Sequence, residues 1–269
     1  MELKLIMKDQ KNYFNLKDLN VFITGAYSHL GQAICEGIGS YGAKLIINGT
    51  NKDKLIKLQK YLKKKDIRSS IAFFDITNYE DVKKFTKNLK NLDVLIHNAN
   101  KTFHTPLRKF DRENYIQTFD TAILSLTNLI NCTTKYLAKS AKKNRTSSII
   151  NISSMYGLVS PDPNIYDNPI NASSPQYGVA KAAMIHHTKY LAVHLAKYNI
   201  RVNSISPGAF PNKTVLKDKK FRKKLASKSP LKRTGNPEEL VSSVLYLASK
   251  SSSFTTGTNL IVDGGWTAW

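Results

Sequence analysis

Short apolar segments alternate with longer amphipathic ones from about residue 20 to the end of the chain, and this alternation limits the fold more than any other feature. The apolar segments predict buried strands, and the amphipathic segments predict helices. Successive units of this kind form parallel β-α-β structure, so we expect an α/β fold with a doubly wound parallel sheet of about seven strands and helices on both faces. The predicted strands are 20–24, 44–48, 70–75, 93–98, 148–153, 201–206 and 259–262, and the predicted helices are 30–41, 52–64, 79–89, 112–141, 175–198 and 237–247.

The chain length of 269 residues fits one α/β domain. Because there is no internal repeat or low-complexity linker, we expect residues 18–269 to form a single domain and residues 1–17 an N-terminal extension. This extension lacks the apolar core of a secretory signal, and no run of about 18 apolar residues predicts a membrane span. Two cysteines, Cys35 and Cys132, are too few for a disulfide framework or a zinc site. We therefore expect a cytoplasmic protein without a metal.

The formal net charge of +22 indicates either an anionic partner or a surface that is simply rich in lysine. Lysine runs at 63–65 and 217–224 fall on helix faces and helix ends, without the interleaved aromatic residues that stack on nucleic acid. This favours the lysine-rich surface, with no nucleic-acid and no membrane partner. The charge would still attract a phosphate-bearing cofactor or an anionic substrate.

A glycine-containing turn follows the first predicted strand. Gly25 permits a tight turn at the strand end, and Gly31 lies six residues later, at the start of the next helix. The N-terminus of such a helix directs free N–H groups toward a phosphate. His29, between the two glycines, has three interpretations: it crowds the cofactor, it donates to a phosphate, or it is a surface histidine without a role.

This turn resembles that of the short-chain dehydrogenases/reductases, with His29 at the family's middle glycine, and the resemblance runs from about Phe14 to Trp269. It implies a Rossmann-like fold, an NAD(P) cofactor, hydride transfer between a carbonyl and an alcohol, and a homotetramer or homodimer. Asp75 and Ile76 stand where the family contacts adenine, and 207–208 stands where it borders the nicotinamide. The cofactor-binding residues that it implies are Gly25, Ser28, His29, Leu30, Gly31, Thr50, Asn51, Asp75, Ile76, Asn98, Ala99, Tyr177, Lys181, Pro207 and Gly208.

The end of the second predicted strand bears on the choice between NADP and NAD. An acidic residue there binds the ribose 2′-hydroxyl of NAD and repels a 2′-phosphate. Residues 48–52 contain no acid, and Lys52 adds positive charge. This favours NADP without excluding NAD, and the alternative is that Lys52 only begins a basic helix.

Tyr177 and Lys181 are four residues apart in a predicted helix, so they share one face. A tyrosine exchanges its proton near neutral pH only when its phenolate is stabilised, and a nearby ammonium does this. The same Tyr-x-x-x-Lys spacing occurs four more times in the chain, but only this pair opens the helix that follows the fifth predicted strand. The resemblance adds Ser154, and not Ser153, as the hydroxyl that orients a carbonyl. We predict Ser154, Tyr177 and Lys181 as the catalytic residues.

Two departures from the family pattern concern the catalytic region. Ser154 and Tyr177 are 23 residues apart, more than is usual, and the proline-rich extra segment 161–174 predicts a rigid loop over the active-site edge. This loop either shapes the substrate pocket or is a surface insertion packed on a neighbouring subunit. The family's helical asparagine, which supports a proton-relay water, has no counterpart. Ala122 is the expected match, and Thr121 would be a poor substitute.

The segment before Tyr177 and the C-terminal sequence GGWTAW resemble enzymes of flagellin or surface-sugar modification, which implies a sugar or nucleotide-sugar substrate. The 3-oxoacyl-acyl-carrier-protein reductases are close relatives and offer an alternative, as does a catalytically weak member that acts as a cofactor-binding scaffold. Retention of all three catalytic residues favours an active enzyme over a scaffold. The hypothesis of a nucleic-acid binder is supported by charge alone. An extended-type epimerase is disfavoured because the chain lacks the length for its second domain.

Overall fold

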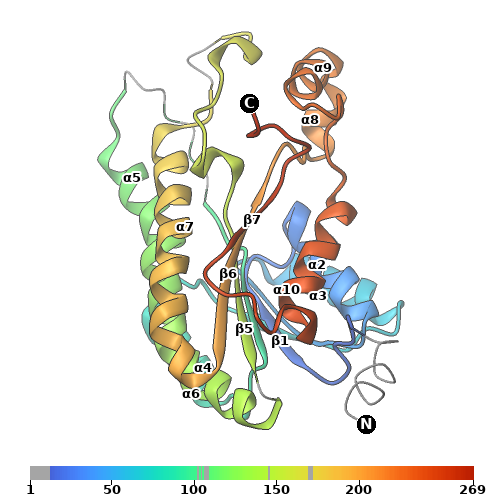
Figure 1. Cartoon of the computed structure of the whole chain (residues 1–269), viewed down its shortest axis with the longest axis vertical. Coiled ribbons are helices and arrows are strands. Elements are labelled where there is room, and N and C mark those ends of the chain that lie inside the picture. Colours follow the sequence, from blue (N-terminus) through green and yellow to red (C-terminus); the bar gives the residue numbers. More distant parts are fainter. Residues whose placement is uncertain (1–12, 102, 104, 106–108, 145, 169–171) are drawn as a thin grey trace.

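The computed structural model describes residues 13–269 except 102, 104, 106–108, 145 and 169–171, so most of the predicted N-terminal extension lies outside the described residues. Seven parallel strands form one sheet in the order β3-β2-β1-β4-β5-β6-β7, which confirms the predicted doubly wound sheet (Figure 1). The strands are β1 (Asn20–Ile23), β2 (Lys44–Gly49), β3 (Ser69–Phe73), β4 (Val94–His97), β5 (Ser147–Ile152), β6 (Ile200–Pro207) and β7 (Asn259–Val262).

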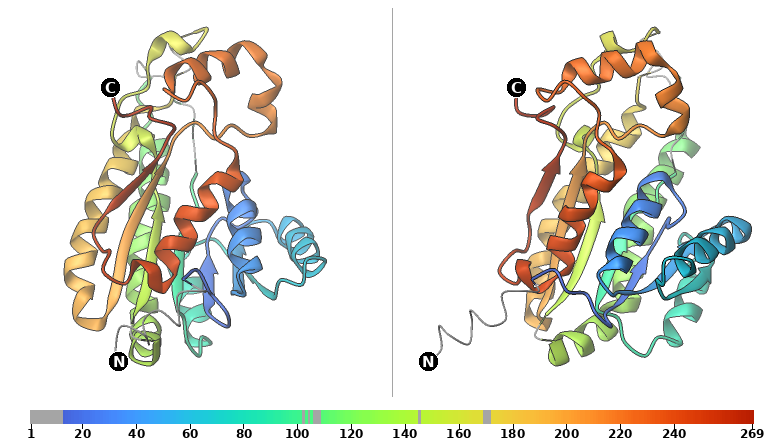
Figure 2. Two further views of the ribbon diagram at one scale, coloured as in Figure 1. Left: turned by 45° about the vertical axis from the view of Figure 1, so that its right-hand side comes forward. Right: turned by 90° about the vertical axis from the view of Figure 1, so that its right-hand side faces the viewer.

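Helices cover both faces of the sheet (Figures 1 and 2). One layer contains α2 (His29–Ser40), α3 (Lys52–Lys63) and α10 (Val241–Ala248), and the other contains α4 (Tyr79–Lys87), α5 (Arg112–Phe119), α6 (Ser125–Asn144) and α7 (Pro175–Leu195). Each layer has its own apolar core against the sheet. Ile34 and Leu55 are buried in the first core, and Leu129 and Met184 in the second. Burial of aliphatic side chains on both faces is the main stabilising term of such a fold.

The central strands are buried along their whole length, and this explains their uninterrupted apolar sequences. Every residue of β4, β5 and β6 is buried, as expected for parallel strands that are covered on both sides. The strand order changes direction at β1, which pairs with β2 on one side and β4 on the other. In sheets of this kind, ligands bind at that switch point, outside the carboxyl ends of the strands.

The helix predicted over 112–141 is interrupted in the structure. α5 ends at Phe119, a π-helical turn spans Asp120–Leu124, and α6 begins at Ser125. Within this turn the Thr121 hydroxyl donates to the carbonyl of Gln117, and the Ser125 hydroxyl donates to the carbonyl of Thr121. Hydroxyls that bond back to the helix backbone bend helices, and π turns often lie at functional sites.

Two helices, α8 (Lys213–Lys217) and α9 (Lys219–Lys228), were not among the helices predicted from periodicity, although the lysine run 217–224 was placed on helix faces and ends. α9 is strongly polar and buries a single residue, Leu225, so the apolar repeat that predicts a helix is missing. Instead, side-chain caps define these helices: Asn212 accepts from the first-turn N–H groups of α8, and Asp218 does so for α9.

No helix in the described part of the chain is both long enough and apolar enough to span a bilayer. Cys35 and Cys132 are free thiols. Among the described residues, no cluster of three or more His, Cys, Asp or Glu side chains is arranged to hold a metal ion.

Candidate active site

A cavity of about 530 Å³ opens at the carboxyl edge of the sheet, at the switch point. Of the residues predicted from the sequence, Gly25, Ser28, His29, Leu30, Thr50, Asp75, Ile76, Asn98, Ala99, Tyr177 and Lys181 line it. The cavity is also lined by residues that were not predicted as catalytic or cofactor-binding: Tyr27, Asn48, Gly49, Phe74, Asn100, Lys101, Thr121, Ile152, Ser153, Phe210 and Asn212. The cavity therefore joins the phosphate turn, the ends of β2 to β5 and the first turns of α7.

Five predicted residues do not line this cavity. Gly31 lies inside α2, where a Cβ atom would come 2.4 Å from the carbonyl oxygen of Gly25. Asn51 caps α3 by accepting from the N–H of Lys54, and Ser154 caps a short 3-10 turn. Pro207 ends β6, and a Cβ atom at Gly208 would come 2.5 Å from the Cα of Asp263. Gly31, Asn51, Pro207 and Gly208 therefore have structural contacts next to the cavity, while Ser154 adjoins it through its hydrogen bond to Tyr177.

The phosphate turn requires glycine at position 25. Gly25 has φ +62°, and a Cβ atom there would lie 2.9 Å from the Cα of Ala99. The Asn98 amide donates to the carbonyls of Thr24 (3.1 Å) and Gly25 (2.9 Å) and to the hydroxyl of Ser28 (3.1 Å). Asn98 thus ties the end of β4 to the turn.

The start of α2 suits the pyrophosphate of a dinucleotide. This twelve-residue helix has no acidic residue in its first turn, so its N-terminal N–H groups and positive dipole end are not neutralised by a carboxylate. His29 lines the cavity, and its Nε2 is buried with no hydrogen-bond partner among the described residues. Burial lowers the pKa of His29, so a neutral ring faces the site. The glycine cradle, the helix terminus and this unpartnered nitrogen together fit a dinucleotide cofactor.

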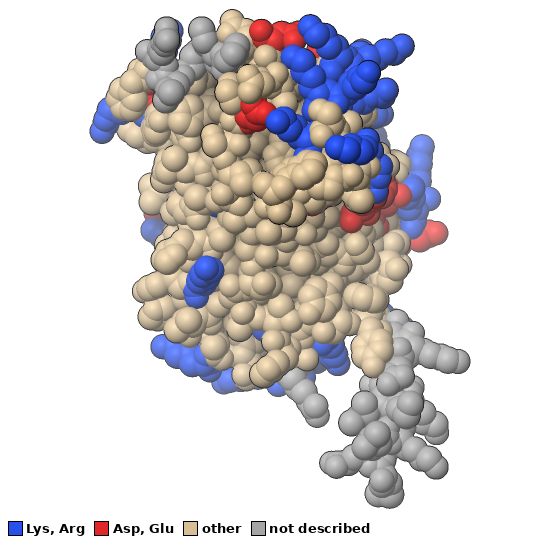
Figure 3. All heavy atoms as spheres, turned by 45° about the horizontal axis from the view of Figure 1, so that its top comes forward, with Lys and Arg blue, Asp and Glu red and all other residues tan. Residues whose placement is uncertain are grey.

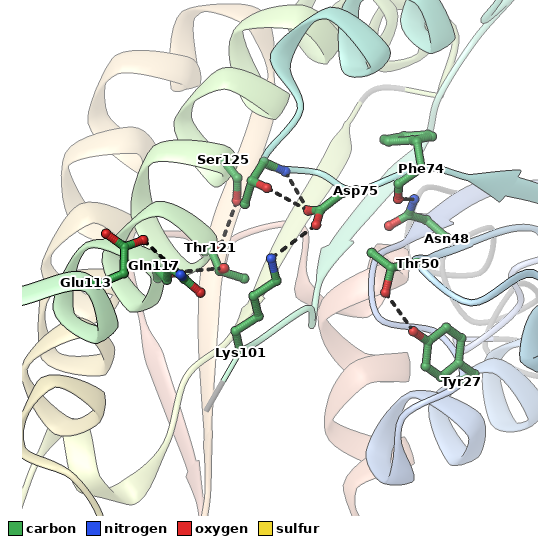
Figure 4. Close-up of polar contacts among 11 residues, drawn as sticks. Tyr27, Asn48, Thr50, Phe74, Asp75, Lys101, Glu113, Gln117, Thr121 and Ser125 are labelled. Atoms are coloured by element: carbon green, nitrogen blue, oxygen red, sulfur yellow. Dashed lines mark hydrogen bonds and ion pairs between the residues drawn. The ribbon is translucent and has the colours of Figure 1, made fainter. Parts of the chain in front are cut away.

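Polar side chains gather at the ends of β2 and β3 (Figure 4). The Tyr27 hydroxyl lies 3.0 Å from the Thr50 hydroxyl, and Lys54 Nζ lies 5.5 Å from the centre of the Tyr27 ring. Asp75 pairs with Lys101 at 3.1 Å. Burial alone would raise the pKa of Asp75, but hydrogen bonds from Thr77 and Lys101 hold it below its usual value. A carboxylate paired in this way stays ionised beside the cavity.

Tyr177 and Lys181 lie one helical turn apart at the start of α7, and Ser154 reaches them from the end of β5. The Nζ of Lys181 lies 5.7 Å from the centre of the Tyr177 ring. Burial raises the pKa of Tyr177, and a hydrogen bond from Ser154 to the phenol oxygen acts in the opposite direction. Ser153 is next to Ser154, but its hydroxyl donates to the carbonyl of Lys181 at 2.9 Å. The structure thus brings the three predicted catalytic side chains together.

Within the segment 161–174, residues 162–167 pack against α9, and residues 169–171 lie outside the described part. Asp162 pairs with Lys228, and Asp167 pairs with Lys220 at 3.1 Å and Lys224 at 2.8 Å. The Tyr166 ring lies 5.5 Å from that of Phe221, between ring centres. Figure 3 shows Lys and Arg side chains gathered with a few acidic ones on this end of the molecule. Ion pairs and a ring contact thus hold the predicted loop against α9, which was not among the predicted helices.

Comparisons with known proteins agree with this geometry. The profile of the family described as "Enoyl-(Acyl carrier protein) reductase" matches residues 25–267. The 5-keto-D-gluconate 5-reductase of Escherichia coli K12 is 29% identical over 94% of this chain and 96% of its own. The 3-oxoacyl-[acyl-carrier-protein] reductase of Rickettsia bellii is 32% identical over 93% of this chain and 98% of its own.

Among solved structures, the gluconate 5-dehydrogenase of Burkholderia cenocepacia, determined in complex with NADP and tartrate, has the same fold. Its TM-score is 0.84, at 24% identity over 96% of this chain and 98% of that one. The fold, the profile match and the full-length relatives define a class of protein: an NAD(P)-dependent oxidoreductase. The chain belongs to the short-chain dehydrogenase/reductase family.

Proposed function

We propose that this protein is an NADP-dependent reductase that converts a ketone of a polyhydroxylated, anionic substrate, such as a keto sugar acid, to the alcohol. The observation that carries the proposal is the meeting of Ser154, Tyr177 and Lys181 beside a glycine turn that fits a dinucleotide. NADPH, when bound, supplies the hydride. The protein's own groups then have to hold the carbonyl and deliver one proton to its oxygen.

In this proposal Tyr177 is the proton donor. Its O–H donates to the substrate oxygen as that oxygen gains negative charge, and the proton moves across, which leaves a phenolate. The hydroxyl of Ser154, in hydrogen-bond contact with the phenol, orients the same oxygen. The ammonium of Lys181, held in place by the carbonyl of Ile152 at 2.8 Å, stabilises the phenolate.

The preference for NADP rests on the end of β2. The hydroxyls of Tyr27 and Thr50 and the ammonium of Lys54 could bind a 2′-phosphate, and none of the three carries negative charge at neutral pH. Neither Lys52, which begins α3, nor Lys54 lines the cavity, but the Nζ of Lys54 lies over the ring of Tyr27, which does line it. We therefore assign the discriminating positive charge to Lys54.

The substrate class rests on charge and on the relatives. α9 and the preceding turn carry exposed basic residues on the surface shown in Figure 3, which would attract an acid group. One relative named above reduces a keto sugar acid. The sequence also suggested a nucleotide-sugar from surface modification, and the same basic residues would attract its phosphates. The relatives named above do not favour such a substrate over a free sugar acid. Reduction of a 3-oxoacyl group on an acidic carrier protein is the second candidate, favoured by the Rickettsia relative.

The test is a spectrophotometric assay of NADPH oxidation with 5-keto-D-gluconate and, separately, with acetoacetyl-coenzyme A. Turnover of the first and not the second supports the keto sugar acid, and the reverse supports the acyl-carrier alternative. Tyr177→Phe should abolish turnover while NADPH fluorescence still reports binding. Full activity of Tyr177→Phe would refute the mechanism, and NADPH binding without any turnover would support the scaffold alternative.

We also propose a homo-oligomer in a reducing, cytoplasmic setting. α7 exposes Val179, Tyr190 and Val193 at 55%, 57% and 76%, which is unfavourable in water and suits a partner subunit. The free thiols of Cys35 and Cys132 suit a reducing compartment. Light scattering at micromolar concentration tests the first point, and Val193→Glu should shift the mass toward the monomer.

A further inference from the structure

His97, the last residue of β4, is a fully buried histidine that the reaction scheme does not use. It stands directly opposite Asn151 of β5 in the parallel register, so the two side chains point to the same face of the sheet. The Asn151 amide donates to the Thr188 hydroxyl on α7 at 2.9 Å, which identifies that face as the one beneath α7. His97 therefore lies between the sheet and the helix that carries Tyr177 and Lys181.

The hydrogen bonds around Thr24 determine which nitrogen of His97 carries the proton. The Thr24 hydroxyl oxygen accepts from the backbone N–H of Asn98 (3.1 Å) and of Ala99 (3.0 Å). A hydroxyl accepts about two hydrogen bonds and donates one, so its remaining capacity is its own proton. The Nδ1 of His97 lies 3.5 Å from this oxygen and is positioned to receive that proton. Nδ1 is then an acceptor, and the ring proton is on Nε2.

The surroundings of the ring keep it neutral. Burial lowers the pKa of His97 to about 3, and the charges of Lys181 and, to a lesser extent, His187, both on α7, act in the same direction. The backbone carbonyl of Thr121, in the π turn, acts on the ring as a hydrogen-bond acceptor and opposes this shift only in part. The described groups that act on the ring include no carboxylate.

Two acceptors lie on the same side of the sheet as the ring or act on it: the side-chain oxygen of Asn151 and the carbonyl of Thr121. Nε2 is buried and makes no hydrogen bond of good geometry with a described atom. Because Nδ1 is directed at Thr24, we assign the interaction with the Thr121 carbonyl to Nε2, at a geometry looser than a full bond. The Oδ1 of Asn151, on the same face of the sheet, is likewise buried and has no donor among the described residues. A donor at Nε2 suits this environment, and a second acceptor would not. Thr121 itself lines the cavity, so the ring connects the phosphate turn to a wall of the active site.

We propose that His97 is a positioning residue: as a neutral imidazole protonated on Nε2, it links the Thr24 hydroxyl to the π turn at Thr121 and thereby fixes the cavity wall beside Lys181. The inference rests on the proposed catalytic role of Lys181. The tautomer of His97, which is the structural part of the proposal, can be tested without an activity assay.

The first experiment is ¹⁵N NMR of the histidine side chains in the cofactor-free protein from pH 5 to 8, with His97 assigned from the spectrum of His97→Gln. The expected result is a ring that remains neutral and protonated on Nε2 throughout. A ring that titrates near the usual histidine pKa, or that carries its proton on Nδ1, overturns the proposal. An enzyme inactive on both trial substrates would count against the proposed function, while this measurement would still decide the role of His97.

The second experiment separates the two ends of the ring. His97→Asn keeps an acceptor near the position of Nδ1, and His97→Gln places an amide N–H near the position of Nε2. We expect His97→Gln to keep kcat within about threefold of the parent. His97→Asn should lower kcat about tenfold with an unchanged KM for NADPH, because the shorter side chain of this variant loses contact with the π turn. His186→Asn, at an exposed histidine of α7, is the matched control and should change neither constant.

A purely structural role would lower the thermal midpoint of both His97 variants without separating their kcat values. Equal kcat losses in the two variants, or no loss in His97→Asn, would therefore overturn the proposal. If His97→Asn fails to fold, the wild-type NMR result and the kcat of His97→Gln still decide it.

Discussion

The Nζ of Lys181 donates a 2.8 Å hydrogen bond to the backbone carbonyl of Ile152, from a side chain that is only 3% exposed. Burial lowers the pKa of Lys181 to about 8, since the ammonium has left water without gaining a carboxylate as partner. The protein thus holds a charge beneath Tyr177 at a cost to its own stability. This arrangement is typical of sites selected for chemistry at the expense of stability.

The first prediction is that Lys181→Met makes the protein more stable and inactive. At pH 7 the lowered pKa corresponds to a penalty on the order of 3 kcal/mol. Loss of the hydrogen bond to the Ile152 carbonyl would offset about 1 kcal/mol of this penalty. The free energy of unfolding of Lys181→Met should therefore exceed that of the wild type by about 2 kcal/mol. Between the folded pKa of about 8 and the ordinary value of 10.5, the unfolded wild-type chain binds more protons than the folded one. The stability of the wild type therefore rises with pH over that window, and the advantage of Lys181→Met disappears.

Urea unfolding at pH 7 and at pH 10.5 measures this difference. Lys189→Met, at an exposed position of the same helix, is the control and should change the free energy of unfolding by less than about 0.5 kcal/mol. A destabilised Lys181→Met at pH 7 would contradict the view that the buried ammonium is costly.

The second prediction concerns the pH dependence of carbonyl reduction. As pH rises through about 8, Lys181 loses the proton that makes it an ammonium, and the phenolate left by Tyr177 loses its stabilising charge. We expect kcat/KM with NADPH to fall above about pH 8, and the basic limb to move upward in Lys181→Arg, because a guanidinium stays charged. A profile that is flat to pH 9.5 in the wild type would refute this role for Lys181.

The third prediction separates backbone strain from cofactor binding by means of two glycines. Gly25 and Gly257 both have positive φ, +62° and +75°. A Cβ atom at Gly25 would lie 2.9 Å from the Cα of Ala99, whereas at Gly257 it would make an ordinary 3.5 Å contact with Ala192. Both alanine variants should lose about 1 kcal/mol of stability, but only Gly25→Ala should weaken NADPH binding, by about tenfold or more.

NADPH fluorescence titration and thermal unfolding provide the two readouts. If Gly257→Ala weakened NADPH binding as much as Gly25→Ala does, the effect would come from general destabilisation rather than from the phosphate turn.

The alternation of strands and helices was enough to predict the sheet, because the central strands are short buried runs and the helices beside them have apolar faces. Tyr177 and Lys181 could also be paired from the sequence, since a four-residue spacing in a helix is a local relationship. The contact of Tyr177 with Ser154 was expected from the family resemblance, and the structure agrees with it. The catalytic roles of these residues stay predictions.

The cavity wall at the π turn could not be predicted by counting along a regular helix. A π turn adds one residue to the helical turn and so changes which side chain faces the site. Ala122, the expected counterpart of the family asparagine, is fully buried in the apolar core, and Thr121 lines the cavity instead. Likewise, α9 has too few apolar residues to be recognised, so the ion pairs of Asp167 with it could not be foreseen.

The last prediction concerns Lys54, the residue to which we assign the preference for NADP in place of Lys52. Lys54 Nζ lies over the ring of Tyr27, whose hydroxyl contacts Thr50, so a 2′-phosphate at this end of the cavity would meet two hydroxyls and one ammonium. Lys54→Glu places a carboxylate there and should weaken NADPH binding about tenfold or more, because a phosphate dianion is repelled. NADH, which has no 2′-phosphate, should bind within about twofold of its parent affinity.

Dissociation constants for both dinucleotides, measured by fluorescence at low salt, give the comparison, since screening weakens exposed charges at high salt. Lys60→Glu makes the same charge change nearly two turns further along α3 and is the control for the overall field. If Lys60→Glu weakened NADPH binding as much as Lys54→Glu, the general positive charge of the protein would explain the preference. If neither variant changed the ratio of the two constants, the 2′-phosphate would bind elsewhere, and the assignment of Tyr27, Thr50 and Lys54 would be wrong.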